Sequence, residues 1–256
     1  MYAWTQTGLP IVRPLFLNDP DDPAVYAYLN DQFFLGRDIL VAPILAPAAN
    51  AGGAARRNVY LPTGIDWYAL GDHDQALGPP MPGGRLLEDV EAGLDQMPVF
   101  VRAGAIVPLR SRDEQYVGEL AHNPLMIVIY PGPDREYLLY QDDGMTTQAE
   151  ATGAFRTTRI TRRGVPGGTG VRLERFVDGY APAEPFLFIR LLQMQRPETV
   201  TVEGKSLRDA ASLAALDAAA ADAYVWDEGQ AAVTIKVFTA SADLSVTVLF
   251  AAQGSG

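Results

Sequence analysis

The sequence predicts a mainly β protein, in which a short segment of mixed strand and helix precedes two antiparallel β-domains. Residues 9–17 (LPIVRPLFL) are almost all apolar, which is typical of a buried strand in a parallel sheet, and residues 24–35 carry apolar side chains at helical spacing. After residue 45 the helical spacing disappears and short strand-like segments alternate with turns. The 24 Gly and 19 Pro residues agree with a globular chain that has many turns.

The mixed segment ends with a further predicted strand at residues 39–45. Asp22 is placed to cap the helix of residues 24–35, and Gly36 suits its C-terminal end. The Pro- and Gly-rich loop of residues 78–84 is expected to lack regular structure. Strands of a first β-domain are expected at residues 57–61, 67–70, 99–101 and 105–109.

A second β-rich block begins near residue 125. The Asp-Gly pair in residues 141–144 predicts a hairpin or tight turn, because Gly tolerates a positive φ. The Ala-rich residues 209–223 fit either a helix or a surface insertion. The Gly-rich residues 52–53 and 164–170 lack a phosphate-binding pattern and are expected to be loops. Strands are expected at residues 125–130, 136–140, 155–161, 171–176, 186–192, 199–202, 224–227, 232–238 and 245–250.

The charge and residue composition argue against several classes of function. A formal net charge of -11 disfavours nucleic acid and anionic membrane surfaces as partners, whereas a neutral ligand such as a sugar is indifferent to it. The chain has no cysteine, which excludes disulfides, thiolate nucleophiles and Cys-based zinc sites. Neither a signal peptide nor a run of eighteen apolar residues is recognisable, and the compartment stays open.

Histidine chemistry is not expected. His73 and His122, the two histidines, lie far apart in sequence and among turn residues, so we interpret both as exposed loop residues. A Ser-His-Asp triad would need a nucleophile elbow, and the G-x-S-x-G pattern is absent. We expect no metal site and no cofactor.

Three groups of neighbouring carboxylates are interpreted as turn formers, helix caps and solvated charges. Retaining glycoside hydrolysis needs two carboxyl groups about 5–5.5 Å apart across a sugar, which neighbours in a turn do not provide. Calcium binding at the first group is a minor alternative, because an EF-hand loop needs further oxygen ligands. The groups are Asp19 with Asp21 and Asp22, Asp72 with Asp74, and Asp142 with Asp143.

Aromatic side chains offer an alternative role in sugar binding. Trp67, Tyr68 and Trp226 could form a platform for the apolar face of a pyranose, but a Trp in a β-domain is more often part of the core. We therefore favour a core position for these side chains.

Five segments, in order, resemble glycoside hydrolase family 31, the α-glucosidase and α-xylosidase type. GLPIVRPLF at residues 8–16 is similar to the last barrel strand region of that family, and DQFFLGRDILVAP at 31–43 to its exit from the barrel. The similarity continues in VYLP at 59–62 with Trp67 and Tyr68, and in PVFVRAGAIVP at 98–108. YQDDG at 140–144 is similar to a hairpin of the distal C-terminal domain.

The resemblance implies a retaining α-glycosidase whose catalytic aspartates lie upstream of residue 1. None of the family's catalytic or sugar-contacting positions maps onto this chain, so we expect no catalytic residue here and leave the substrate-binding residues unknown. By itself the chain is expected to be inactive and structural. Its expected partners are the missing N-terminal part of the enzyme and, through the missing barrel, an α-linked oligosaccharide. The alternative is a stand-alone carbohydrate-binding or interaction β-sandwich.

The resemblance also fixes the expected domains. Residues 1–38 would be the end of a (β/α)8 barrel, namely its last strand and helix, residues 39–120 the proximal C-terminal β-domain, and residues 121–256 the distal one, both similar to antiparallel β-sandwiches. Met1 would then be an internal methionine. Arg13 is expected to be buried and paired with a carboxylate. The face around Val12, Leu15, Phe33 and Phe34 is expected to be exposed.

Overall fold

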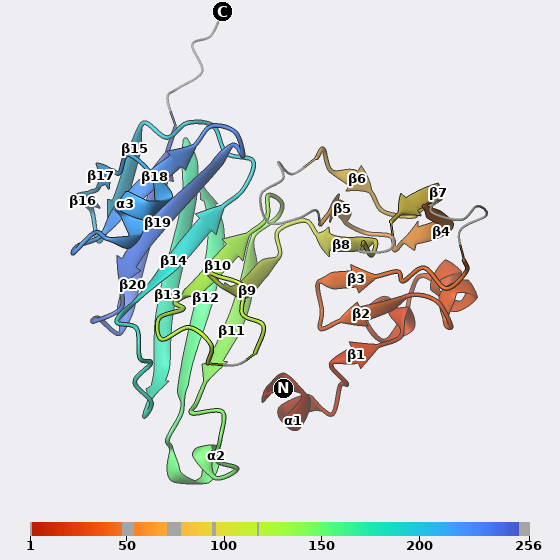
Figure 1. The fold of residues 1–256 in the computed structure, drawn as a ribbon, viewed down its shortest axis with the longest axis horizontal. Coiled ribbons are helices and arrows are strands. Elements are labelled where there is room, and N and C mark those ends of the chain that lie inside the picture. Colours follow the sequence, from red (N-terminus) through yellow and green to blue (C-terminus); the bar gives the residue numbers. More distant parts are fainter. Residues whose placement is uncertain (1, 48–53, 71–77, 94–95, 117, 251–256) are drawn as a thin grey trace, which may run out of the picture. The chain divides into compact units, whose positions relative to one another are not determined.

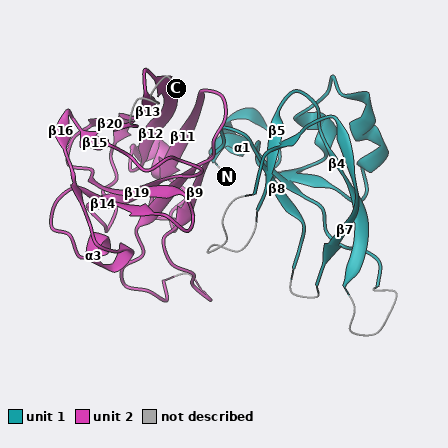
Figure 2. Ribbon diagram, turned by 90° about the horizontal axis from the view of Figure 1, so that it is seen from above, with its two compact units in different colours: residues 1–105 teal, residues 106–256 magenta. Residues whose placement is uncertain are grey.

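The protein divides into two compact units, Met1–Ala105 and Ile106–Gly256, each described here by itself (Figure 1) (Figure 2). The computed structural model describes residues 2–47, 54–70, 78–93, 96–116 and 118–250. Its described helices are all too short to cross a membrane. The predicted division into residues 1–38, 39–120 and 121–256 stays a prediction.

Unit 1 has a six-stranded sheet in the order β1-β2-β3-β8-β5-β6 and a two-stranded sheet of β4 and β7. The elements, with 3-10 helices written η, are α1 (Tyr2–Thr7), β1 (Val12–Arg13), η1 (Leu15–Leu17), η2 (Pro23–Tyr28), β2 (Phe33–Leu35), β3 (Ile39–Val41), β4 (Ala55–Leu61), β5 (Asp66–Ala69), β6 (Met81–Pro82), β7 (Arg85–Ala92) and β8 (Val99–Arg102).

The prediction of a buried parallel strand at residues 9–17 is wrong. The strand β1 is only two residues long, lies at the edge of the sheet and pairs antiparallel with β2. Pro10 and Pro14 lack the N–H group that a central strand donates, which confines this segment to an edge. Every strand pair among the described residues of unit 1 is antiparallel, so the expected barrel remnant is not seen.

The predicted helix at residues 24–35 is also wrong beyond Tyr28. Asp22 does cap η2, because its side chain accepts a hydrogen bond from the N–H of Ala24 at 3.0 Å. The chain then turns at Gly36, which has a φ of +68°, and β2 pairs with β3 across this turn. The apolar residues that suggested helical spacing therefore serve a hairpin. The loop at residues 78–84 likewise contains a short strand, β6, which pairs with β5.

The expected exposed face near the N-terminus is largely part of the core of unit 1. Val12 is 56% exposed, but Leu15 and Phe34 are fully buried and Phe33 is half-buried. The chain therefore covers most of the surface that we expected to be open. Other buried members of this core are Val25, Leu40, Val59, Leu61, Trp67 and Phe100.

Unit 2 is a sandwich of two six-stranded sheets, in the orders β17-β18-β19-β14-β10-β9 and β11-β12-β13-β20-β15-β16. Two pairs in the first sheet, β10 with β14 and β17 with β18, are parallel, and the remaining pairs in both sheets are antiparallel. The elements are β9 (Ile106–Arg110), β10 (Leu125–Ile129), β11 (Arg135–Gln141), α2 (Ala149–Thr152), β12 (Arg156–Val165), β13 (Gly168–Asp178), β14 (Phe186–Leu191), β15 (Thr199–Val202), β16 (Lys205–Ser206), β17 (Arg208–Asp209), α3 (Leu213–Asp217), β18 (Ala223–Asp227), β19 (Ala232–Phe238) and β20 (Asp243–Leu249).

One apolar cluster joins the two sheets of unit 2. Ile127, Ile189 and Ile235 come from the first sheet, and Ile160 and Val246 from the second, and all five are fully buried. Alternating side chains on each strand supply this core, as is typical of a β-sandwich. The strands predicted at residues 199–202 and 232–238 coincide with β15 and β19.

We expected the Gly-rich residues 164–170 to form a loop, and this prediction is wrong. They form the end of β12, the start of β13 and the tight turn between the two strands. Gly167 makes the turn with a φ of +71°. A Cβ at Gly168 would lie 2.0 Å from the carbonyl oxygen of Val248, so only Gly allows β20 to pair so closely at this point. The Ala-rich residues 209–223 contain the short helix α3, capped by Ser212.

Candidate functional site

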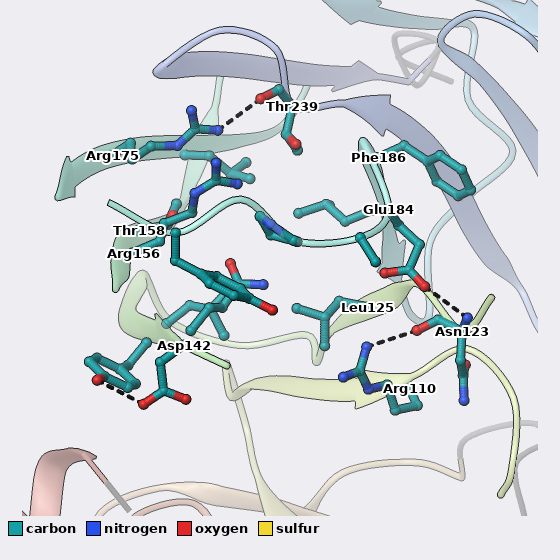
Figure 3. Close-up of a pocket in the computed structure, with 18 of the residues that line it drawn as sticks. Arg110, Asn123, Leu125, Asp142, Arg156, Thr158, Arg175, Glu184, Phe186 and Thr239 are labelled. Atoms are coloured by element: carbon teal, nitrogen blue, oxygen red, sulfur yellow. Dashed lines mark hydrogen bonds between the residues drawn. The ribbon is translucent and has the colours of Figure 1, made fainter. Parts of the chain in front are cut away.

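A cavity of about 630 Å³ lies in unit 2 and is lined by residues of both sheets (Figure 3). Its size falls within the range of about 300–1,000 Å³ that is usual for small-ligand sites. Five leucines give it an apolar lining continuous with the core of the sandwich. They are Leu125, Leu139, Leu173, Leu187 and Leu244.

Arg156 and Arg175 line one side of the cavity (Figure 3). Both guanidinium groups also bond to the carboxylate of Asp178. Arg156 Nε lies 2.7 Å from Oδ1, Arg175 Nη1 lies 2.9 Å from Oδ2, and Arg175 Nη2 donates to the carbonyl of Thr239. Asp178 experiences some desolvation, but the hydrogen bonds from Arg175 and Arg156 hold its pKa below the ordinary value. Both guanidinium groups are thus fixed in place.

On the opposite side, Asn123 connects two loops and the end of β9 (Figure 3). Its backbone N–H donates to Glu184 Oε1 at 2.9 Å, its carbonyl accepts from Arg110 Nη1 at 2.8 Å, and its side-chain Oδ1 accepts from the N–H of Arg112 at 3.0 Å. Asn123 itself is buried. These bonds order the polar wall that faces the two arginines.

The charges that line the cavity balance. Three arginines, at positions 110, 156 and 175, lie among three carboxylates, at positions 114, 142 and 184. Hydrogen-bond donors and acceptors are therefore both present around an apolar floor, without an excess of either charge. Such a lining suits an uncharged ligand with many polar groups better than an ion.

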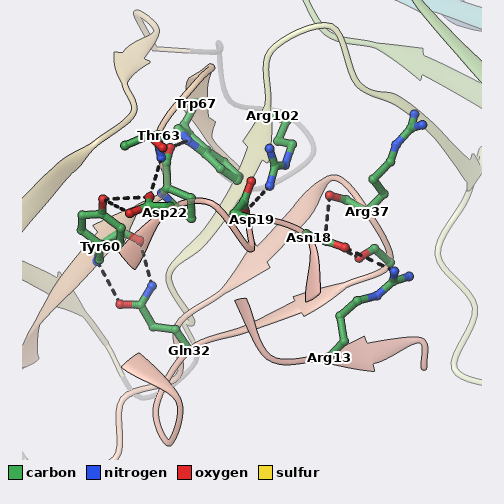
Figure 4. Close-up of polar contacts among 12 residues, drawn as sticks. Arg13, Asn18, Asp19, Asp22, Gln32, Arg37, Tyr60, Thr63, Trp67 and Arg102 are labelled. Atoms are coloured by element: carbon green, nitrogen blue, oxygen red, sulfur yellow. Dashed lines mark hydrogen bonds and ion pairs between the residues drawn. The ribbon is translucent and has the colours of Figure 1, made fainter. Parts of the chain in front are cut away.

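In unit 1, a second polar group surrounds Asp22 (Figure 4). Its carboxylate, 4% exposed, accepts hydrogen bonds from Tyr60 Oη at 2.9 Å and from the N–H of Thr63 at 2.9 Å, in addition to that of Ala24. Burial opposes ionisation, but these donors outweigh it and lower the pKa of Asp22. Burial and the adjacent Asp22 raise the pKa of Tyr60 to about 12. Gln32 completes the group with two hydrogen bonds of 2.9 Å to the backbone of Tyr60.

Asp19 is likewise committed to the fold. Its Oδ2 lies 2.5 Å from Arg102 Nη2, and the two side chains are only 11% and 10% exposed (Figure 4). The guanidinium carbon of Arg102 also lies 4.8 Å from the ring centroid of Trp67 and 5.0 Å from that of Phe34. This arrangement joins the turn before η2 to β8.

Contrary to our expectation, no carboxylate of the described residues pairs with Arg13. Its Nη1 donates to the side-chain oxygen of Asn18 at 3.2 Å, and the Asn18 amide donates to the carbonyls of Gly36 and Arg37 (Figure 4). Arg13 is half-buried, and this burial lowers its pKa. The residue therefore helps to hold the β2–β3 turn, and its role is structural.

The interpretation of the aromatic residues as core is confirmed. Trp67 is fully buried and donates its Nε1–H to the carbonyl of Pro62, and Tyr68 is buried beside it on β5. Trp226 is partly buried against the core of unit 2. A sugar platform built from Trp67 and Tyr68 is therefore excluded.

The remaining acidic and histidine candidates are not brought together. Asp143 is exposed and its pKa is lowered by hydrogen bonds from the N–H groups of Thr146 and Met145, as expected for a turn. Asp142 lines the cavity of unit 2, whereas Asp21 and His122 are exposed. The described residues contain no group of three acidic or histidine side chains that could hold a metal. His73, Asp72 and Asp74 lie outside the described residues.

The sequence did not point to Tyr60, Gln32 or Arg102 in unit 1, or to the cavity arginines in unit 2. Arg102 ends the otherwise apolar strand β8, and an arginine in such a strand is usually paired when it is buried. This was the one sequence feature that could have indicated the ion pair. The others depend on contacts between residues far apart in the chain. Hydrogen-bond partners such as Gln32 and Tyr60, 28 positions apart, follow only from the fold.

Residues 8–107 match the model of the glycosyl hydrolase family 31 C-terminal domain. The α-xylosidase of Saccharolobus solfataricus is 34% identical over 150 residues, 58% of this chain and 19% of that protein. The isomaltosyltransferase of Sporosarcina globispora is 28% identical over 250 residues, 95% of this chain and 20% of that protein. These matches confirm the resemblance that the five segments predicted.

A solved structure agrees over almost the whole chain. The Flavobacterium johnsoniae family 31 dextranase, complexed with glucose, superposes with a TM-score of 0.84 at 26% identity, covering 97% of this chain and 30% of the dextranase. The mainly β architecture with several antiparallel sheets is thus consistent with the C-terminal β-sandwich domains of that family. This chain spans about a fifth of the length of the curated relatives named above.

Proposed function

We propose that this chain is the C-terminal portion of a retaining α-glycosidase, because residues 8–107 match the family 31 C-terminal domain and its relatives include an α-xylosidase and an α-glucosidase. The whole enzyme would hydrolyse terminal α-linked glucose or related sugars. In this proposal the chain supplies structure, and the two catalytic carboxylates belong to the part of the enzyme that precedes it. The expected partners are that preceding part and, through it, an α-linked oligosaccharide.

The bonding of the two buried aspartates in unit 1 is the observation that carries the non-catalytic role. A retaining enzyme needs one carboxylate free to attack the sugar and another carboxyl group about 5–5.5 Å away to donate a proton. Asp19 is bound to Arg102, and Asp22 accepts hydrogen bonds from three donors. Neither side chain is accessible to a substrate.

The edge of the six-stranded sheet supports a contact with the preceding part of the enzyme. Val12 on β1 pairs with Leu35 on β2, and both side chains are exposed, as is that of the neighbouring Ile11. An edge strand with exposed apolar side chains is a surface that proteins usually cover. We assign it to the contact with the upstream part of the enzyme.

The test is hydrolysis of 4-nitrophenyl α-D-glucopyranoside and of the α-D-xylopyranoside. The 256-residue chain is assayed beside the same chain preceded by its upstream coding sequence. Turnover by the extended protein alone is the expected result. Turnover by the short chain would refute the proposal, because it would place the catalytic carboxylates within these residues.

A further inference from the structure

The cavity of unit 2 has no part in the chemistry proposed above, yet it has the properties of a binding site. Its lining combines leucines that belong to the core of the sandwich with charged and amide side chains, a mixture that is usual for small-ligand sites. Its polar groups come from strands of both sheets, from the described residues 111–116 and 118–124, and from the loop at residues 179–185. We propose that this cavity binds a short neutral oligosaccharide, one to three sugar units long.

The polar groups match the chemistry of a sugar. Each hydroxyl both donates and accepts a hydrogen bond, and a pyranose also has C–H surfaces that pack on apolar side chains. Arg110 and Arg175 offer donors, Glu184 and Asp142 offer acceptors, and Leu125 lies on the floor between them (Figure 3). An alternating set of this kind can bind neighbouring hydroxyls in pairs.

The charge distribution selects against an anion. Arg156 and Arg175 share the carboxylate of Asp178, which offsets one of their two positive charges, and an anionic group near Arg110 would also meet Glu184. The chain as a whole carries a formal charge of -11, which repels anions further. A neutral polyhydroxylated ligand avoids both costs.

The walls of the cavity are formed before any ligand arrives. The N–H of Gly179 donates to the carbonyl of Phe155 at 2.8 Å, and a Cβ at Gly179 would lie 1.7 Å from the carbonyl oxygen of Gly153. This close approach fixes one end of the loop at residues 179–185, and the bond from Asn123 to Glu184 fixes the other. Binding therefore requires little ordering of loops, which favours affinity.

The choice of an α-linked sugar rests on the proposed function, whereas the neutral, polyhydroxylated character of the ligand rests on the cavity. Maltotriose and isomaltotriose are suitable probes, because they differ in linkage and carry no charge. Binding of each to the full chain is measured by isothermal titration calorimetry. Octanoate, with an apolar tail and one negative charge, is the contrasting probe.

Two matched variants locate the site. Ala183 and Ala181 are both exposed on the loop at residues 179–185, but only Ala183 lines the cavity. Ala183→Trp should weaken trisaccharide binding at least tenfold by filling the cavity, while Ala181→Trp should leave it within twofold of the original chain. Arg110→Met, which keeps the bulk and removes the donors, should weaken binding at least threefold.

Saturable binding of either trisaccharide that Ala183→Trp abolishes is the expected result. The inference is overturned if neither trisaccharide binds, if Ala183→Trp leaves binding unchanged, or if octanoate binds in their place. These outcomes are independent of the hydrolysis assay, which decides the catalytic role of the chain without reference to this cavity. Failure of one proposal is therefore distinguishable from failure of the other.

Discussion

Unit 1 buries charged side chains at the centre of its fold, whereas unit 2 buries a continuous apolar cluster and gathers its charges around a cavity. Asp22 and the pair of Asp19 and Arg102 lie among the aromatic residues of unit 1. In unit 2 the main exception is Lys236, whose Nζ donates to two carbonyls at the end of α3. Both units are built mainly of β-strands, but buried polar contacts stabilise unit 1 and apolar packing stabilises unit 2.

The lengths of the strands explain this difference. The six strands in the main sheet of unit 1 have two to four residues, while β12 and β13 of unit 2 have ten and eleven. Short strands bury little apolar surface, so hydrogen bonds and an ion pair must hold the connecting turns in position. Unit 1 should accordingly be sensitive to the loss of single polar groups, and unit 2 to the loss of apolar volume.

The largest effect is expected from Asp19→Ala. This change leaves the guanidinium of Arg102 buried without its carboxylate, which costs about 3–5 kcal/mol in comparable cases. The free energy of unfolding of unit 1 can be measured by urea titration from the fluorescence of the buried Trp67, in a Trp4→Phe, Trp226→Phe background. Asp21→Ala, at an exposed neighbour, is the matched control and should change the free energy little. Equal losses in both variants would contradict the assignment.

Ile189→Ala should produce the next largest effect, in unit 2. Ile189 is fully buried between the sheets, and removing such a side chain costs about 2–5 kcal/mol through lost burial and the cavity left behind. Trp226 packs against this core, and in a Trp4→Phe, Trp67→Phe background its fluorescence reports the unfolding of unit 2. Leu138→Ala, at a side chain that is 48% exposed, should cost much less. Comparable losses would indicate that the core is not continuous.

A smaller, pH-dependent effect is expected from Asp22→Asn. Because the folded-state pKa of Asp22 is lowered, the ionised carboxylate stabilises the fold above its unfolded pKa, and this contribution is lost as the pH falls through the folded value. The loss on substitution should be about 1.5–3 kcal/mol at pH 7 and should shrink below about pH 4. Urea titrations between pH 3 and 7 measure it, with Asp21→Asn as the control. A loss that stays constant over this range would contradict the lowered pKa.

The smallest effect is expected from Glu91→Gln in unit 1. Arg56 Nη2 lies 2.6 Å from Glu91 Oε2, but the two side chains are 59% and 52% exposed, so water and salt screen the pair. The substitution should cost less than about 1 kcal/mol. A cost as large as that of Asp19→Ala would show that burial does not set the strength of these pairs.

Much of the fold follows from the sequence. The alternation of apolar residues located β15 and β19 to the residue, and the order of the family segments identified the chain as β-rich and related to family 31. The errors occurred where local patterns are ambiguous. Residues 24–35 have helical spacing, yet Gly36 allows β2 and β3 to form a hairpin, and only the pairing of these strands decides between the two.

The polar groups were harder to predict than the strands. The spacing of Asp19, Asp21 and Asp22 is compatible with a turn, a cap or a cation site. The roles of Asp22 and Asp19 depend on Tyr60 and Arg102, which lie 38 and 83 positions away. The cavity of unit 2 arises where loops meet the ends of two sheets, which no local pattern records. Hydrophobic periodicity thus predicts layers, whereas sites depend on long-range contacts.

The most direct test of the claim that the buried charges of unit 1 stabilise the fold is a double-mutant cycle on Asp19 and Arg102. Asp19→Ala, Arg102→Met and the double variant are compared with the original chain by urea unfolding. We predict that the double variant loses less stability than the sum of the single losses, with a coupling energy of about 1–3 kcal/mol. Additivity of the two losses to within about 0.5 kcal/mol would contradict the account.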